Sequence, residues 1–416
     1  MRIIADFHLH SKYSRATSKN LNLSELAKWS RIKGVNLAAT GDFTHPKYIE
    51  EIKSKLVSDG LGLFNLKSGN QDIKFILSTE VACIYKHKGA TRRLHHLILA
   101  PDIQSVERIN KKLTSLGCNI TADGRPILGL TSKQLLEVVL EANSENVLVP
   151  AHVWTPWFAI FGSKSGYDTV EDCFEDLSKY IFALETGLSS DPEMNWALSQ
   201  LDKYTLISNS DAHSGPNIGR EANVFELKEI SYSSIIKAIK NKNPKDFLYT
   251  IEFFPEEGMY HIDGHRSCKV SFMPEKTKKM KNICPVCKKP LTVGVLHRVD
   301  NLKDRKFGYQ PPGAIPFKKI TPLPNLISDY YGMGKQSKKV QTLFYNIISQ
   351  ASNEFEVLLD TPLKGLKKIM PAGLAAGIIK VREQKVNLEP GFDGVYGKVH
   401  VFSVEDRRQN LQKSLF

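Results

Sequence analysis

The first half of the chain repeats one pattern, in which a short apolar run leads to a residue able to bind a metal ion. The runs favour β-strands and lie at residues 2–7, 35–40, 73–78, 94–99, 146–151, 180–184 and 204–208. Helical patterns lie between them, such as residues 24–33 with Ser24 as N-cap, and residues 131–142 with a capping box of Thr131 and Gln134. This alternation predicts an α/β fold with a parallel sheet.

Polar residues follow so many of these runs that a closed barrel is favoured over an open sheet. The carboxyl ends of all barrel strands meet at one mouth, whereas an open sheet brings only a few strand ends together. We therefore predict a distorted (β/α)7-8 barrel over residues 1–255. The pattern breaks between Pro244 and Gly258. A small zinc-binding module is then expected over residues 256–310, and a mixed, mainly helical C-terminal region over residues 311–416.

Histidines and carboxylates gather at the ends of the apolar runs. His8 and His10 lie two residues apart on an extended segment, so both can reach one cation, and Asp211 and His213 repeat this spacing. Any one of these histidines could be an ordinary core or surface residue, but the whole set predicts two or three ions and the hydrolysis of phosphate esters. Besides Glu185, the candidate ligands are His8, His10, Asp42, His45, Glu80, His95, His152, Asp211 and His213.

Two adjacent histidines compete for one place in this set. If residues 94–99 form a strand, His95 and His96 point to opposite faces, so only one can bind metal, and we choose His95. Asp211 and His213 are also expected to take part in catalysis.

A second metal site is predicted from the cysteines. Cys284 and Cys287 form a C-x2-C pair, and His265 and Cys268 form an H-x2-C pair ahead of it. Four such ligands make a closed structural zinc site. His261 or His297 could replace His265 as the fourth ligand, and the alternative for the cysteines is free thiols in a core.

Charge is distributed unevenly along the chain, and this suggests a polyanionic partner. The formal net charge of +13 comes from the second part: residues 1–260 carry a net charge of −1 and residues 261–416 a net charge of +14. A basic region of this size favours nucleic acid over a small substrate, although a lysine-rich solvated surface is the simpler alternative. The candidate DNA-binding residues are Lys335, Lys338, Lys339, Arg266 and Arg298.

Two further C-terminal features are weaker signals. Glycines at residues 332–334 precede a helical pattern that begins with lysines, so backbone N–H groups there could bind a phosphate, although any glycine turn looks similar. The peptide Gln412–Phe416 resembles the start of a sliding-clamp-binding motif, and an unspecific tail is the alternative. The chain has no apolar run of membrane-spanning length and no recognisable signal peptide, so we expect a cytoplasmic protein.

Several of these motifs resemble those of the PHP (polymerase and histidinol phosphatase) family. The segments that carry the resemblance are His8-Leu9-His10-Ser11, residues 40–46, Glu80, Ala151-His152 and Ser210-Asp211-Ala212-His213. The resemblance implies a distorted barrel, a multinuclear zinc or manganese site and phosphoesterase chemistry. The chain departs from the family pattern at Ala16, where Asp or His is common, and at residues 41–45, so the resemblance leaves open whether Asp42, His45 or both bind metal.

A fuller resemblance, extending past residue 400, is to the endonuclease Q family of DNA repair nucleases. It is carried by residues 185–192, 261–266, 284–287 and 390–397. The resemblance implies cleavage of the phosphodiester 5′ of a deaminated base (uracil, hypoxanthine or xanthine) or of an abasic site, in double- or single-stranded DNA. Within residues 185–192, Asp191 is a candidate metal ligand or general base, or else the N-cap of a helix that starts at Pro192.

We therefore expect a metal-dependent endonuclease with zinc in both sites, or with magnesium or manganese in the catalytic one. The alternatives are a phosphomonoesterase of the histidinol phosphatase type and a DNA-binding repair scaffold without catalysis. The basic C-terminal part argues against the first alternative, and the nearly complete ligand set argues against the second.

Overall fold

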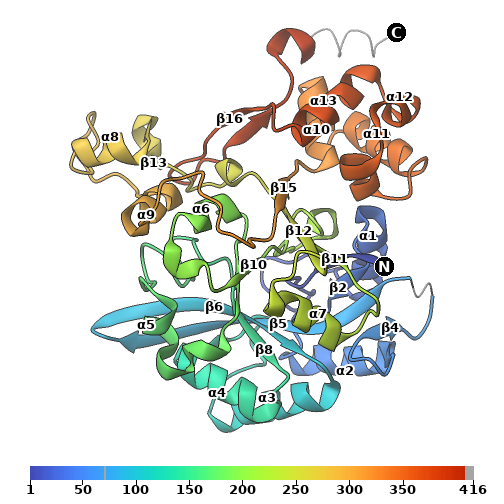
Figure 1. The fold of residues 1–416 in the computed structure, drawn as a ribbon, viewed down its shortest axis with the longest axis vertical. Helices are drawn as coiled ribbons and strands as arrows, with labels where there is room; N and C mark the ends of the chain where they lie inside the picture. The colour runs from blue at the N-terminus through green and yellow to red at the C-terminus, as the bar shows by residue number, and fades with distance from the viewer. Residues whose placement is uncertain (70–71, 408–416) are drawn as a thin grey trace.

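The structure, a computed structural model, describes residues 1–69 and 72–407 (Figure 1). Its main element is a mixed 11-stranded sheet with the path β15-β12-β11-β1-β2-β5-β4-β3, to which β6, β7 and β8 are attached beside β5. The strands are β1 (Arg2–Asp6), β2 (Leu37–Ala39), β3 (Leu56–Ser58), β4 (Phe64–Leu66), β5 (Lys74–His87), β6 (Ala90–Ala100), β7 (Ile127–Leu128), β8 (Val147–Pro150), β11 (Ala222–Glu226), β12 (Phe247–Glu252) and β15 (Phe317–Lys319). The prediction of an α/β fold is confirmed.

The prediction of a purely parallel sheet is wrong. β1, β2 and β5 are parallel neighbours, but β11, β6 and β8 run antiparallel to their partners. β5 and β6 form one long hairpin because Lys88 and Gly89, at its turn, both have positive φ values of 50° and 76°, as a two-residue hairpin turn requires. β15, from the range expected for the C-terminal region, pairs with β12 at the edge of this sheet.

The large sheet does not close into a barrel in the part of the chain that the structure describes. β9 (Ala183–Glu185) and β10 (Thr205–Ile207) instead form a separate parallel pair. This pair reaches its neighbours through single hydrogen bonds, such as Val153 N to Glu185 O at 3.0 Å, and through the isolated bridge between Leu9 and Ala212. The predicted closed barrel is therefore replaced by a curved sheet plus a second small sheet, and all seven predicted apolar runs contain strands.

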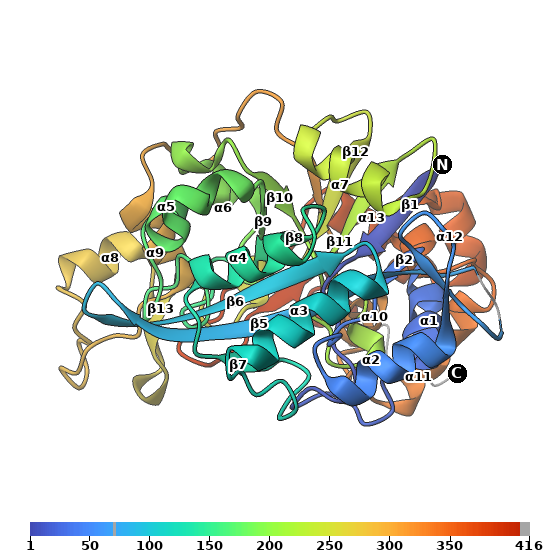
Figure 2. The same ribbon diagram turned by 90° about the horizontal axis from the view of Figure 1, so that it is seen from below.

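Helices of the first part cover the sheet. Figure 2 shows α3 and α4 side by side along the β5–β6 hairpin. The capping box of Thr131 and Gln134 at α4 is confirmed, whereas the N-cap of α1 is Asn22, not Ser24, because the Asn22 side chain accepts the backbone N–H groups of residues 24 and 25. The helices are α1 (Leu23–Lys33), α2 (Pro46–Lys55), α3 (Ile103–Ser115), α4 (Ser132–Ala142), α5 (Val170–Phe174), α6 (Pro192–Trp196) and α7 (Tyr232–Asn241), with short η1 (Glu175–Tyr180), η2 (Ser199–Leu201) and η3 (Gly215–Asn217).

The rest of the chain forms two smaller groups of elements (Figure 1). The cysteine-containing segment has η4 (Pro255–Glu257), β13 (Asp263–His265), η5 (Arg266–Cys268), β14 (Val270–Phe272), α8 (Pro274–Lys279) and α9 (Val295–Leu302). The following segment has α10 (Leu323–Tyr331), α11 (Lys338–Ile348), η6 (Glu356–Asp360), α12 (Leu363–Ile369), α13 (Ala372–Arg382), β16 (Asn387–Glu389) and β17 (Lys398–His400). The predicted clamp-binding peptide, Gln412–Phe416, lies outside the described residues. Among the described residues, no helix is both long and apolar enough to cross a bilayer.

A buried ion pair joins the first part of the chain to the C-terminal helices. Lys33, at the end of α1, lies 2.6 Å from Glu354, and both side chains are almost fully buried. Replacing Glu354 by alanine would leave the Lys33 charge buried without a partner, so we expect a loss of about 3 to 5 kcal/mol in the free energy of unfolding. Chemical denaturation would measure this loss. The double variant Lys33→Met/Glu354→Leu should recover much of it, and an unchanged stability of Glu354→Ala would contradict the assignment.

Two buried carboxylic acids lie side by side where β11 and β12 pair, and they predict a pH-dependent stability. Burial, with the nearby Asp191 charge, raises the pKa of Glu252 from 4.5 to about 8, and burial together with Glu252 raises the pKa of Glu221 well above its ordinary range. A raised folded-state pKa contributes stability that is present below pH 4.5 and is lost as the pH rises through about 8. We therefore expect the melting temperature to fall between pH 6 and pH 9, and Glu252→Gln to make this fall smaller. Exposed Glu137→Gln is the control, and equal pH profiles for all three proteins would contradict the prediction.

Candidate metal centre and its relatives

Four predicted ligands meet just beyond the carboxyl end of β1. His8 and His10 follow this strand and face Glu80 from β5 and Asp211, and one ligand atom from each of the four lies within 4.8 Å of the others. His10 Nε2 is 3.1 Å from Asp211 Oδ1 and 3.3 Å from Glu80 Oε2. The buried Nε2 of His8 has no hydrogen-bond partner among the described residues, although it points into this group. An orphaned imidazole nitrogen beside two carboxylates fits a cation.

A second group shares one residue with the first. Glu80 Oε1 lies 2.7 Å from His95 Nδ1 and 3.0 Å from His152 Nε2, and the two imidazole nitrogens are 3.2 Å apart. All three side chains are buried. Glu80 therefore offers one oxygen to each group, and a carboxylate between two ligand sets can hold two ions side by side.

The backbone is strained at this site. Asp42, His152 and Asp211 are not glycines, yet their φ values are 47°, 31° and 48°. Such left-handed conformations cost about 1 to 3 kcal/mol each and persist where the surrounding structure imposes them, often at functional sites. His152 and Asp211 belong to the ligand groups and Asp42 contacts His10, so the fold imposes these conformations at the site.

Buried acids around the histidines set the orientation and charge of the rings. Glu185 Oε1 lies 3.0 Å from His8 Nδ1, and Asp42 Oδ1 lies 3.1 Å from His10 Nδ1. Burial alone would lower the pKa of His8, but Glu185, Glu80 and Asp211 outweigh it and raise that pKa well above 6.5. The pKa of Glu80 is held well below its ordinary value, despite burial, by His95, Arg125 and His8. The site thus holds ionised carboxylates that attract cations.

Asp42 takes the role of an orienting residue in this arrangement. Its Oδ2 accepts hydrogen bonds from the Ser11 N–H and hydroxyl at 2.7 Å, and its Oδ1 faces His10, so the structure does not bring Asp42 into either ligand group. Replacing a carboxylate that orients a metal-binding histidine lowers the metal affinity or the activity by about 10- to 100-fold. We therefore expect Asp42→Asn to lower phosphoesterase turnover within this range while the metal content, measured by elemental analysis, is retained. Loss of a full metal equivalent would instead make Asp42 a direct ligand.

The structure places two other predicted ligands outside both groups. His45 stacks on Tyr13, with ring centroids 4.4 Å apart. The His213 ring lies 4.3 Å from the His10 ring, and its Nδ1 lies 3.0 Å from the Asp211 carbonyl oxygen. His45 thus belongs to neither ligand group, whereas His213 borders the first group.

Two further assignments concern neighbours of the ligands. His96 points away from the ligands and lies 2.7 Å from the Ser132 hydroxyl, on the opposite face of β6 from His95. Asp191 caps α6, since its Oδ1 accepts the Met194 N–H at 2.9 Å, and its Oδ2 forms an ion pair with Lys319 at 2.6 Å. The structure thus shows the capping alternative for Asp191 and does not bring it into either ligand group, so its role as a general base stays a prediction.

Two arginines at the site were missed by the sequence patterns. Arg125 Nη1 lies 3.0 Å from Glu80 Oε2, and its side chain remains partly exposed. The Arg220 Nε donates to the Ser210 carbonyl oxygen at 2.9 Å, next to Asp211. Neither residue lies in a motif with ligand spacing, so only the folded arrangement reveals that they add positive charge beside the ligand groups.

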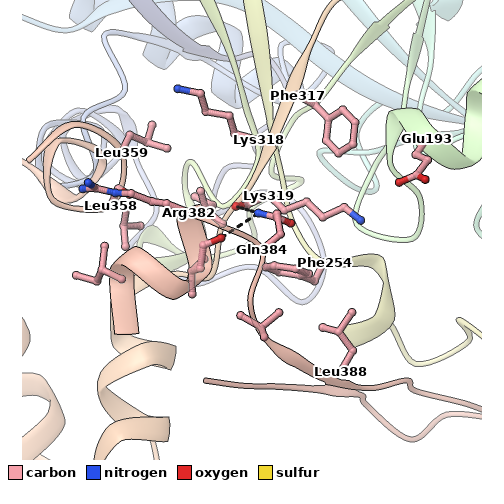
Figure 3. A pocket seen from close by; sticks show the side chains of 14 residues that line it. Glu193, Phe254, Phe317, Lys318, Lys319, Leu358, Leu359, Arg382, Gln384 and Leu388 are labelled. Carbon is pink, nitrogen blue, oxygen red and sulfur yellow. Dashed lines mark hydrogen bonds between the residues drawn. The ribbon is translucent and has the colours of Figure 1, made fainter. Parts of the chain in front are cut away.

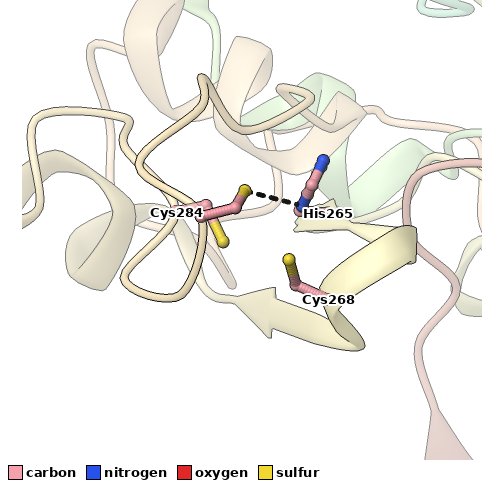
Figure 4. A group of neighbouring side chains, drawn as sticks. His265, Cys268 and Cys284 are labelled. Atoms are coloured by element: carbon pink, nitrogen blue, oxygen red, sulfur yellow. Dashed lines mark hydrogen bonds between the residues drawn. The ribbon is translucent and has the colours of Figure 1, made fainter.

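The predicted cysteine site is assembled in one place. One ligand atom each from His265, Cys268, Cys284 and Cys287 lies within 4.8 Å of the others, and Figure 4 shows the labelled side chains pointing toward one another. His297 instead lies 2.6 Å from Asp263, and His261 is not part of this group. Burial would raise the pKa of Cys284, but the N–H groups of Val286 and Cys287 outweigh it and lower that pKa to about 7. Three thiols and an imidazole around one point form a donor set that zinc prefers.

Comparisons with sequence relatives cover different parts of the chain. A family described as the MJ0043 C-terminal domain matches residues 322–385. The protein MJ0043 of Methanocaldococcus jannaschii is 34% identical over 253 residues, which cover 59% of this chain and 31% of that protein, so the chain spans about a third of its length. The protein YqxK of Bacillus subtilis is 26% identical over 418 residues, which cover 96% of this chain and 99% of that protein.

Two crystal structures resemble the whole fold. One is PfuEndoQ, a lesion-specific endonuclease of Pyrococcus furiosus, with a TM-score of 0.86, 29% identity and coverage of 98% of this chain and 99% of that one. The other is endonuclease Q in complex with a 27-mer duplex substrate that has an abasic lesion at the active site. It has a TM-score of 0.86, 30% identity and coverage of 98% of both chains. The chain belongs to the endonuclease Q family.

In this endonuclease Q family member, the predicted DNA-binding residues lie in different settings. Arg298 forms an ion pair with Asp168 at 2.6 Å, so it holds the cysteine-containing segment against the first part of the chain. Lys335 and Lys338 are exposed at the start of α11, and the Lys339 amino group lies over the Tyr331 ring at 4.6 Å. The Arg266 backbone N–H binds Asp393. Three lysines thus flank the α11 N-terminus, whereas Arg298 has a structural partner.

A cavity of about 560 Å³ lies apart from the metal ligands of this endonuclease Q family member. Figure 3 shows it between β15 and the end of α13, with Phe254, Phe317 and Lys319 around it. None of the described residues that line it belongs to a ligand group. The cavity therefore does not contribute to the metal centre.

Proposed function

We propose that this protein is a DNA repair endonuclease that uses several metal ions to hydrolyse the phosphodiester 5′ of a damaged nucleotide. The damaged site would be a deaminated base (uracil, hypoxanthine or xanthine) or an abasic site, in double- or single-stranded DNA. The observation that carries the proposal is the pair of buried ligand groups that share Glu80. The likeness to endonuclease Q with an abasic duplex supports DNA as the substrate.

The proposal divides the work among three parts of the chain. Residues 1–255 would hold the catalytic centre as a phosphoesterase unit built on the curved sheet, residues 256–310 a structural zinc, and residues 311–416 much of the DNA contact surface. The net charge of +14 over residues 261–416 supports this division, because a polyanion gains most of its affinity from such charge. Lys335, Lys338 and Lys339 would contact the phosphates near the start of α11.

The catalytic ions would be zinc, which imidazole ligands suit, with magnesium or manganese, which carboxylate ligands suit, as alternatives. Such ions supply positive charge that stabilises a phosphodiester in its transition state. His8, His10 and Asp211 would hold one ion, His95 and His152 the other, and Glu80 both. Arg125 would add a fixed positive charge beside the scissile phosphate, and His213 would exchange protons with the reacting groups from beside Asp211.

One experiment tests the proposal. Protein loaded with zinc or manganese is incubated with labelled duplexes that contain one deoxyuridine, one abasic site or no lesion, and separately with a phosphomonoester. We expect a nick 5′ of the lesion and no reaction with the undamaged duplex. Hydrolysis of the phosphomonoester alone would make the protein a phosphatase, and binding without cleavage would make it a scaffold. Either result would overturn the proposal.

A further inference from the structure

The loop between β16 and β17, residues 390–397, is held rigidly although the metal centre makes no use of it. Gly391 N donates to Glu256 O at 2.8 Å and Gly397 N to Glu257 O at 3.1 Å. Phe392 and Val395 exchange both backbone hydrogen bonds across the tip. The two residues between them have positive φ values of 43° and 84°, which is the geometry of a tight hairpin turn.

Side chains fasten the same loop to the cysteine-containing segment. Asp393 accepts hydrogen bonds from the Thr292 hydroxyl and from the Arg266 N–H, both at 2.6 Å. A Cβ atom at Gly397 would lie 2.0 Å from the Glu256 carbonyl oxygen, so only glycine allows this close approach. The loop is thus fixed on two sides and cannot bend away when a ligand arrives.

This rigid tip presents an aromatic side chain to solvent. Tyr396 is 70% exposed, more than any other aromatic residue that the structure describes, and Val395 beside it is also exposed. Lys398, two residues further on, adds an exposed positive charge. The backbone that carries the Tyr396 ring is already ordered. Little conformational entropy of this loop is therefore lost when a flat partner binds to the ring.

A chain of contacts leads from this tip to the metal centre. Gly394, two residues before Tyr396, borders Tyr260, and the Tyr260 ring contacts the Trp157 ring with centroids 5.4 Å apart. The Thr155 hydroxyl donates to the Trp157 carbonyl oxygen, and it lies 3.1 Å from Nδ1 of the ligand His152.

We propose that Tyr396 stacks on a nucleobase of bound DNA that is unstacked from its neighbours beside the scissile phosphate. The inference rests on the proposed function, and it assigns a positioning residue to that reaction. Every nucleobase offers a flat π-face, and base–aromatic stacking combined with nearby positive charge is the usual way in which proteins hold unstacked bases. Tyr396 with Lys398 supplies this combination on the loop whose contacts lead to the ligand His152.

The test uses full-length, metal-loaded protein and a duplex with 2-aminopurine next to an abasic site. The fluorescence of 2-aminopurine reports unstacking, and the Asp211→Asn background prevents cleavage during the titration. We expect Tyr396→Ala to weaken binding by about 10-fold and to lose the fluorescence change, whereas Tyr396→Phe keeps both. Tyr180→Ala, at a tyrosine that is 47% exposed at the end of η1, is the matched control and should behave like the parent.

The outcomes separate the inference from the proposed function. If wild-type protein nicks the abasic duplex but Tyr396→Ala equals its parent in affinity and fluorescence, the stacking role is overturned and the endonuclease stands. Equal losses in Tyr396→Ala and Tyr180→Ala would also overturn the stacking role. If wild-type protein neither binds nor nicks the duplex, the proposed function falls, and the role of Tyr396 falls with it. A monomer–dimer shift on Tyr396→Ala with unchanged DNA binding would assign the tip to a second copy of the chain instead.

Discussion

Replacing Glu80 by glutamine is expected to reduce nicking of a lesion-containing duplex by about 1,000-fold or more. Its two oxygens face different ligand groups, His8, His10 and Asp211 on one side and His95 and His152 on the other. An amide carries no charge and presents only one good acceptor, so both ion sites would lose their shared ligand. A loss of several kcal/mol in transition-state stabilisation corresponds to about 1,000-fold in rate.

The measurement is single-turnover nicking at saturating enzyme, together with metal content and DNA affinity. Duplex affinity should change only a few-fold, because the basic surface that attracts DNA lies elsewhere. Glu137→Gln, which makes the same chemical change at an exposed site on α4, should behave as wild type. A Glu80→Gln variant that still nicks at the wild-type rate, or that loses DNA binding to the same extent as nicking, would refute the shared-ligand role.

The sequence was sufficient to predict which residues end the strands, but not how the strands are connected in space. A ligand at a strand end can be recognised locally, because His8 and Asp211 each follow an apolar run. Any parallel arrangement of these strands brings their carboxyl ends close together. The antiparallel β5–β6 hairpin depends instead on two residues with positive φ, and one of them, Lys88, does not favour that conformation. The barrel prediction failed because open and closed sheets show the same pattern of apolar runs along the sequence.

Within the site, residue type could be predicted but not residue role. Asp42 and Glu185 have the same chemistry as Glu80, yet they face the Nδ1 atoms of His10 and His8 and so orient these rings. Whether a carboxylate reaches an ion or a ring nitrogen depends on a few ångströms of backbone position, which spacing along the chain does not determine. Arg125 lies far from every motif in sequence and meets Glu80 only after folding.

The cysteine site could be predicted more completely, since its pairs are adjacent in sequence. A C-x2-C turn brings two thiols together by local geometry alone, and the other pair meets them across fifteen intervening residues that contain β14 and α8. The fourth ligand was ambiguous among three histidines, and the structure brings His265 to the cysteines while His297 binds Asp263.

Removing one thiol of this site, by Cys284→Ser, is expected to cost one zinc equivalent per chain and to unfold the segment around it. Little apolar surface is buried there: Cys284, Leu291 and Ile262 are inside, whereas Met273 and Val286 are more than half exposed. A segment with so small a core would depend on a bound zinc ion, since structural zinc contributes about 10 to 16 kcal/mol in small zinc-finger peptides. Limited proteolysis should then cut within residues 266–290, whereas the wild type should resist cleavage there.

Loss of the cysteine site should also weaken DNA binding and slow catalysis, while the catalytic centre keeps its metal. Asp393 fastens the Tyr396 loop to this segment, and Arg298 fastens the segment to Asp168 in the first part of the chain. We therefore expect weaker duplex binding and slower nicking, while the metal held by the histidine groups remains. Elemental analysis should show the loss of one zinc equivalent and no more, and Cys118→Ser, at a cysteine outside the site, is the control. A Cys284→Ser variant with full metal content and unchanged protease resistance would show that the four side chains hold no structural ion.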